Sequence, residues 1–393
     1  MIDVSLAWLG VVTMRVFVTI VISAGMWLGP QPAALRSSAP VVDLLALPAG
    51  GLQPQAVVDD RDTLHVLYFS GLPAGGDLFY MQRRSGLRQF STPLRVNSVS
   101  GSALATGSVR GGQLAVGATG RVHVAWYGAS ELGESKRRPM WYSRLADDGA
   151  RFDAQVNVAT ASGGIDGATV AADRAGNVYV AWHGQGPEDG EGHRTVYVAR
   201  SRDGGRHFAR EEPAPEASTG ACGCCGLRAA IDASGTPHVL YRAATGGVNR
   251  DATWIALSGA PSKPVVLQPW KLNACPMSTF ALARSGADMV AAWETEQQIY
   301  YARLHPGTRT FSTPVVMEGP AGRKHPSVAT NAAGVTLVAW AEGTGWARGG
   351  TVAWEAVDRQ GIRLAAQSNA APVPVWGLVA AVARTDGSFL ILH

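Results

Sequence analysis

Short apolar segments recur along the chain from residue 53 onward, each bounded by Gly, Asp or Asn. Within them β-branched and aromatic residues alternate or run continuously, which is typical of β-strands rather than of amphipathic helices. The most regular copies, most of which end in an aromatic residue, are residues 64–68, 122–126, 178–182, 237–241, 289–293, 336–340 and 388–392. No amphipathic helical pattern follows residue 40, so the chain is predicted to be all-β.

These copies end 47 to 59 residues apart, and further strands follow in most units. Third strands are expected at 140–144, 195–199, 299–303 and 351–355. Fourth strands, as at 91–96 and 312–317, carry an early Pro, which suits an outer edge that need not donate to a ladder. Four antiparallel strands in units of about 50 residues describe the blades of a β-propeller. A β-sandwich is the alternative, but it does not require this period.

The last unit stops after its second strand, at His393, whereas a spare strand at 41–47 precedes the first complete unit. Pairing of these two segments would close the ring and leave no bare sheet edge. Counting this shared blade predicts seven blades, with six as the alternative, in one domain over residues 35–393.

The first residues have the order of an export signal. A Met-Arg pair at Met14 precedes an apolar run over 16–28, and a Pro-Ala-Ala exit ends at Ala34. We therefore expect residues 1–34 to be a signal peptide, with Met14 as the alternative start, and the mature chain to be secreted or periplasmic. An uncleaved membrane anchor is the other interpretation, although the run is short for a full span.

The charge pattern narrows the class of partner. The net charge of +4 comes from scattered arginines rather than from Lys/Arg runs, which disfavours nucleic-acid binding. We expect a monomer that takes a carbohydrate or another small molecule, with no stable membrane span after processing.

Residues 201–208 read Ser-Arg-Asp-Gly-Gly-Arg-His-Phe. This segment resembles the Asp-box of bacterial neuraminidase (BNR) repeats, Ser-x-Asp-x-Gly-x-x-aromatic, with Ser201, Asp203, Gly205 and Phe208 at the motif positions. The Ser and Asp oxygens are expected to accept backbone N–H groups, Gly205 to take a positive φ, and Phe208 to pack inward. The Asp-box is thus interpreted as a folding element without a catalytic role.

The Asp-box resemblance implies a sialidase-like propeller that binds or processes carbohydrate, as an exo-sialidase or a related glycoside hydrolase. Sialidases of this superfamily use an arginine triad, a Tyr-Glu nucleophile pair and an Asp acid/base. The Arg-Ile-Pro segment that carries the first arginine of that family does not occur here, so its catalytic residues are not transferred.

Polar residues follow the second strands of several units, directly at Tyr127, His183, Arg242 and Glu294 and one residue later at Glu342. Because those strands should end on one face of the ring, their side chains are expected to converge at the channel, where ligands usually bind. The candidates are Glu294 or Glu342 as a carboxylate, Arg242 as an anion anchor, and His183 or Tyr127 beside them. Each could instead simply cap its strand.

All four cysteines belong to a Cys-x-Cys-Cys motif and a later Cys-Pro, with a Tyr-Arg strand end between them. This arrangement is similar to that of some secreted bacterial sialidase-like proteins of unassigned activity. In an exported chain a disulfide between Cys275 and Cys222, Cys224 or Cys225 is expected. A thiolate metal site is the alternative, with zinc or copper(I) as the ion and His325 or Met277 as further ligands.

Three functions therefore stay open: a carbohydrate-active enzyme, a non-catalytic propeller that binds a glycan or a protein, and a cysteine-centred metal or redox protein. A binding surface could use the aromatic strand ends Trp126, Trp182, Trp293 and Trp340, although their repeated position favours packing in the blade core. No cofactor is expected, and a metal ion at the cysteine cluster is the open alternative.

Overall fold

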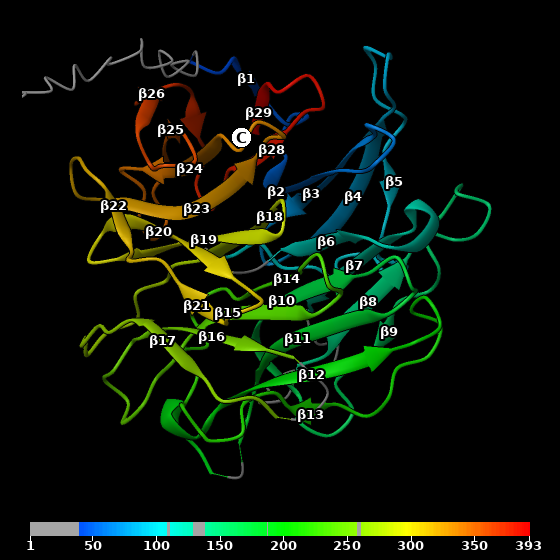
Figure 1. Cartoon of the computed structure of the whole chain (residues 1–393). Coiled ribbons are helices and arrows are strands. Elements are labelled where there is room, and N and C mark those ends of the chain that lie inside the picture. The colour runs from blue at the N-terminus through cyan, green and yellow to red at the C-terminus, as the bar shows by residue number, and fades with distance from the viewer. Residues whose placement is uncertain (1–38, 108–110, 129–137, 187, 258–260) are drawn as a thin grey trace, which may run out of the picture. The chain divides into compact units, whose positions relative to one another are not determined.

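Seven β-sheets are arranged around a central axis in the computed structural model, which describes residues 39–107, 111–128, 138–186, 188–257 and 261–393 (Figure 1). The innermost strand of each sheet contacts that of the next, and the seventh contacts the first, so the ring is closed. These strands are β2 (Leu52–Val58), β6 (Gly112–Val116), β10 (Gly164–Ala172), β14 (Arg228–Ile231), β18 (Phe280–Ser285), β23 (Arg323–Thr330) and β28 (Ala380–Ala383). The predicted all-β, seven-bladed propeller is confirmed. The predicted leader, residues 1–34, lies outside the described residues.

Each of the first six sheets continues outward as an antiparallel meander. The second strands are β3 (Leu64–Leu72), β7 (Val122–Tyr127), β11 (Val178–Gly184), β15 (Pro237–Arg242), β19 (Asp288–Thr295), β24 (Thr336–Glu342) and β29 (Phe389–Leu392), the last belonging to the seventh sheet. The third strands are β4 (Gly75–Arg83), β8 (Met140–Arg144), β12 (Thr195–Ser201), β16 (Ala252–Ala256), β20 (Gln298–His305) and β25 (Gly350–Val357). The outer strands are β5 (Leu94–Arg95), β9 (Val156–Asn157), β13 (Glu212–Pro213), β17 (Val265–Gln268), β21 (Thr310–Phe311) with β22 (Val315–Met317), and β26 (Arg363–Gln367) with β27 (Pro372–Val373).

Helical structure in the described residues is limited to two single 3-10 turns, η1 (Ala118–Gly120) and η2 (Glu191–His193). None of the helices in this part of the chain has the length and apolar character needed to cross a membrane.

The seventh sheet closes the ring with β1 (Val42–Leu45), which pairs with β29, Val42 opposite Phe389. The predicted pairing of the two ends of the chain is therefore confirmed, but β1 runs parallel to β29 and this sheet has three strands rather than four. The direction has a physical reason. Since β1 must end at the face where β2 begins, only the parallel orientation allows the short connection over residues 46–51.

The turns between inner and second strands repeat one hydrogen-bond pattern. An Asp or Asn side chain accepts the backbone N–H of the residue four positions later, at 2.8 to 3.0 Å, and this holds for Asp59, Asp173, Asp232 and Asn331. Such Asx side chains replace the backbone partners that a tight turn lacks. The polar turns that punctuate the sequence are therefore structural.

Seven apolar clusters fill the seven interfaces between neighbouring blades. The repeated tryptophans Trp126, Trp182, Trp293 and Trp340 are at most 2% exposed, and each packs toward the preceding blade, as the core interpretation predicts. Because side chains alternate along a strand, the residue after each of these aromatics points toward the following blade. Those next residues include most of the polar candidates for the channel face.

The segment over 201–208 forms a tight turn after β12. The Oδ1 atom of Asp203 accepts the backbone N–H groups of Arg206 and His207, both at 3.0 Å, and the Ser201 hydroxyl accepts that of Gly205 at 2.9 Å. Gly205 has a φ of 80°, and Phe208 packs inward. Asp203 thus serves the turn.

Candidate metal centre

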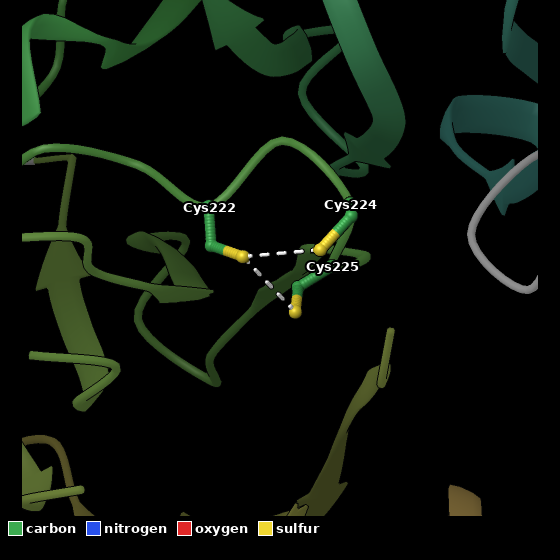
Figure 2. A group of neighbouring side chains, drawn as sticks. All are labelled: Cys222, Cys224 and Cys225. Atoms are coloured by element: carbon green, nitrogen blue, oxygen red, sulfur yellow. Dashed lines mark hydrogen bonds between the residues drawn. The ribbon is translucent and has the colours of Figure 1, made fainter. Parts of the chain in front are cut away.

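Three cysteine sulfurs meet in the loop that leads into the fourth blade (Figure 2). A turn in which the N–H of Cys225 donates to the carbonyl oxygen of Cys222 folds the loop back on itself. The Sγ atom of Cys222 consequently lies 3.3 Å from that of Cys224 and 3.5 Å from that of Cys225, and all three sulfurs lie within 4.8 Å of one another. Cys222 and Cys225 are fully buried and Cys224 is partly exposed.

The backbone around this turn is tied to neighbouring strands. The N–H of Cys222 donates to the carbonyl oxygen of Arg242 at the end of β15, and that of Gly226 donates to the carbonyl oxygen of Ser278, in the segment leading into β18. The cysteines are therefore held between the fourth and fifth blades rather than at the tip of a free loop.

Two buried arginines flank the sulfurs. Arg250 pairs with Glu191 at 2.7 Å, and the charges of Cys222 and Cys224 help to raise its pKa, although burial opposes this. Arg242 donates to the carbonyl oxygens of Arg250 and Glu294 and acts on Cys225 by its charge. Arg242 thus brings positive charge next to Cys225.

The three thiols affect one another's pKa values. Burial would raise the pKa of Cys225, but hydrogen bonds from Cys222 and Cys224, the Arg242 charge and the Ser278 N–H outweigh it and lower that pKa well below its usual range. The pKa of Cys224 is raised, chiefly because this thiol donates to its neighbours. The neighbouring thiols and Arg242 thus act together on the pKa of Cys225.

Two neutral histidines lie around Cys225. Burial lowers the pKa of His183 to about 4 and that of His325 to about 3, and the charge of Cys225 acts on both rings. Neither ring nitrogen of His183, nor Nδ1 of His325, makes a well-formed hydrogen bond within the described residues. Both rings are outside the group formed by the three sulfurs, so the structure brings the predicted extra ligand His325 near the centre without making it a member.

The polar strand-end candidates are enclosed rather than open to the channel. His183, Arg242 and Glu294 have no exposed surface, and Tyr127 is 5% exposed. Glu342 is held by Arg323, whose Nε donates to it at 3.0 Å. The alternation along the second strands explains the placement of Tyr127, His183, Arg242 and Glu294, since these four residues face the next blade. Arg250 was not predicted from the sequence, because no motif connects this residue with the cysteines.

Cys275 does not join the other three. All four cysteines are free thiols, Cys275 is exposed, and it is absent from the sulfur group. The predicted disulfide between Cys275 and the motif is not formed in the structure.

No protein-family model and no curated protein matches this chain. Solved structures do match. An α-L-arabinanase from Penicillium chrysogenum complexed with arabinobiose is 13% identical, with 80% of this chain and 95% of that chain covered and a TM-score of 0.51. An α-L-arabinofuranosidase from Fusarium graminearum is 10% identical, with 83% and 99% covered and a TM-score of 0.51. A Hadza microbial sialidase is 12% identical, with 82% and 69% covered and a TM-score of 0.47. The structural neighbours thus include sialidases and other carbohydrate-active propellers, and at these identities the likeness is one of fold.

Proposed function

We propose that this chain binds a soft metal ion, Cu(I), through Cys222, Cys224 and Cys225. The observation that carries the proposal is the group of three sulfurs within 4.8 Å of one another. Metal–sulfur bonds of about 2.3 Å at the 120° angles of a three-coordinate ion require sulfurs about 4.0 Å apart. The distances of 3.3 and 3.5 Å from Cys222 to its neighbours are shorter than that requirement by roughly half an ångström, which small side-chain rotations can supply.

The charge around the sulfurs supports the same proposal. Three thiolates around a monovalent ion carry a net charge of about −2, which is costly to bury unless cations compensate it. Arg242 supplies a positive charge beside the sulfurs, and Arg250, which already pairs with Glu191, lies beside them as well; both arginines are at most 4% exposed.

The number of ligands favours Cu(I) over zinc. Structural zinc takes four ligands, whereas thiolates alone, in smaller number, suit Cu(I). No His, Asp or Glu joins the three sulfurs in the described part of the chain. Zinc binding would need His183 or another group to move into the centre.

The test is anaerobic reconstitution of the reduced full chain with Cu(I), in competition with a chromogenic Cu(I) chelator. Wild type and Cys275→Ser should retain one copper per chain by elemental analysis, whereas Cys224→Ser should lose it. Cys224 is the least buried of the three, so its replacement by Ser is the least disturbing to the fold. In the loaded folded protein only Cys275 should react with a thiol reagent.

Two results would overturn the metal proposal. The first is wild-type protein that takes up no Cu(I) when all four thiols are titrated as reduced. The second is equal loss of copper in Cys275→Ser and Cys224→Ser. If the protein instead holds one zinc ion per chain and copper does not displace it, zinc rather than Cu(I) is the bound ion. The predicted export makes a disulfide within the motif the competing state, and mass analysis after thiol alkylation detects it.

A carbohydrate ligand in the central channel is the second candidate. It is supported by the fold shared with carbohydrate-active propellers and by a central cavity of about 1190 Å³, which is large enough for a short saccharide. Whether such a ligand is bound or cleaved, and whether the chain is an exo-sialidase or a related hydrolase, are questions for assay with sialosides and arabinan fragments. If the chain binds none of these saccharides, the carbohydrate candidate is ruled out.

A further inference from the structure

The inner strands of the seven blades enclose the central cavity, and its two ends differ. One end is lined by the turns between inner and second strands, whose residues Asp60, Arg61 and Arg174 are exposed. At the other end the lining includes Gly226 and His325, which are buried next to the cysteine centre. The end lined by these exposed turns is called the open end, and it lies opposite the cysteine centre.

One guanidinium reaches across this cavity. Arg228, at the start of β14 in the fourth blade, donates through Nη1 to the side-chain oxygens of Gln55 in the first blade and Gln113 in the second. Both partners are neutral amides, which accept a hydrogen bond but do not neutralise the charge. No carboxylate of the described residues forms an ion pair with Arg228.

Two buried arginines have a carboxylate partner: Arg250 pairs with Glu191, and Arg323 pairs with Glu342. Arg228, which is half-buried, has no such partner among the described residues. Burial lowers the pKa of Arg228 to about 10, and no carboxylate charge offsets that effect. Arg228 nevertheless stays protonated at neutral pH, so the cavity holds a cation without a counter-ion from the protein.

Acidic residues at the open end do not serve as that counter-ion. Asp59 accepts the N–H of Thr63 and pairs with His65, and Asp232 similarly accepts turn N–H groups and pairs with His238. Asp173 binds both the backbone and the side-chain amide of Asn177. These carboxylates are committed to their own turns.

We propose that the cavity binds a small solute that carries a carboxylate, with Arg228 as its anchor. A guanidinium offers a planar fork of donors that matches a carboxylate, so the pair can form two parallel charge-assisted hydrogen bonds. The lining of the cavity as a whole includes many small side chains, such as Ala115, Ala168, Ala281 and Ala329, which leave room for the body of the solute. The site is separate from the three sulfurs and does not depend on metal binding. The proposal shares with the carbohydrate candidate only the premise that a ligand binds in the central cavity.

The test uses D-glucuronate, its neutral counterpart D-glucose, and acetate as a carboxylate without a sugar, at constant ionic strength, with calorimetry and the unfolding midpoint as readouts. Gln113→Glu is the central variant. It replaces one amide by a carboxylate of nearly the same shape, so it neutralises Arg228 while the guanidinium and the fold are retained. Arg228→Gln removes the cation directly. Gln360→Glu, at an exposed position, is the matched control.

Wild type and Gln360→Glu should bind glucuronate or acetate saturably, and Gln113→Glu and Arg228→Gln should weaken that binding by at least about tenfold, the loss expected for a charged hydrogen bond. Binding of acetate without glucuronate would support Arg228 as the anchor and count against the carbohydrate candidate. Equal binding of glucose and glucuronate would overturn the proposal and leave that candidate standing. Unchanged affinity in Gln113→Glu, or no carboxylate binding by wild type, would also overturn it. If Arg228→Gln does not fold, Gln113→Glu and Gln55→Glu decide the result.

Discussion

The ring of Phe208 packs edge-on against the ring of Tyr142, with centroids 4.7 Å apart, and so joins the third blade to the second. The Tyr142 hydroxyl in turn lies 2.7 Å from Nδ1 of His123 on the neighbouring strand. The same arrangement recurs one blade earlier, where Phe152 meets Tyr80 edge-on. The turn that ends in Phe208 therefore contributes to an interface between blades as well as to its own sheet.

Asp203→Ala should destabilise the protein by about 1 to 2 kcal/mol, the usual cost of removing a side chain that caps backbone N–H groups. Two N–H groups lose their acceptor and Phe208 loses its support. Chemical denaturation measures the change. Asp60→Ala, which removes an exposed ion pair with Arg174, is the control and should change stability by less than about 0.5 kcal/mol. Equal effects in both variants would contradict the structural role.

Removal of β1 should destabilise the whole propeller. A chain that begins at residue 48 leaves the edge of β29 unpaired and removes Leu45 and Leu47 from the apolar cluster between the seventh and first blades. A chain that begins at residue 39 retains the strand and is the control. Thermal unfolding should show a lower, less cooperative transition for the shorter chain alone. The same midpoint for both chains would show that β1 is dispensable.

The free energy of unfolding should depend on pH through the ionisation of Glu211. Burial alone would raise the pKa of Glu211, but hydrogen bonds from the Thr160 hydroxyl and from the N–H groups of Ser162 and Ala161 outweigh it and hold the pKa at about 2. In the unfolded chain the pKa of this carboxyl group is about 4.3. Its stabilisation is therefore fully present above about pH 4.3 and is lost as pH falls through about 2.

Glu211→Gln should consequently lower stability by about 1 to 3 kcal/mol at pH 7 and by little near pH 2. Urea denaturation across this range measures the difference. Glu212→Gln, at the adjacent exposed position, is the control and should parallel wild type. A Glu211→Gln deficit that stays constant with pH would show that the ionised carboxylate is not the stabilising form.

Arg242→Lys should cost about 2 to 4 kcal/mol although the charge is kept. The guanidinium donates to two backbone carbonyl oxygens and stacks on Trp270 and Phe280, and an ammonium group cannot reproduce that planar arrangement. Arg363→Lys, at an exposed side chain that pairs with Glu355, should be nearly neutral, because the ammonium group can keep this single ion pair. Equal stability of the two variants would contradict the role given to Arg242.

The repeat of strands and turns could be predicted from the sequence because each blade is made of local contacts. Strand alternation and the Asx turns at Asp59 or Asp232 depend on residues within a few positions of one another. Ring closure followed as well, because an incomplete last unit and a spare first strand leave only one pairing. The parallel direction of β1 was not predicted from the sequence, since it depends on the face of the ring at which β2 begins.

The functional centres depended on the tertiary structure. The motif alone placed Cys222, Cys224 and Cys225 in one short turn, and three sulfurs so close in sequence are bound to be neighbours. Whether Cys275 reached them, and whether Arg250 flanked them, was decided by the packing of loops from different blades, which no local pattern encodes. Arg228 illustrates the same limit: its partners Gln55 and Gln113 are 173 and 115 residues away in sequence, and only closure of the ring brings them together.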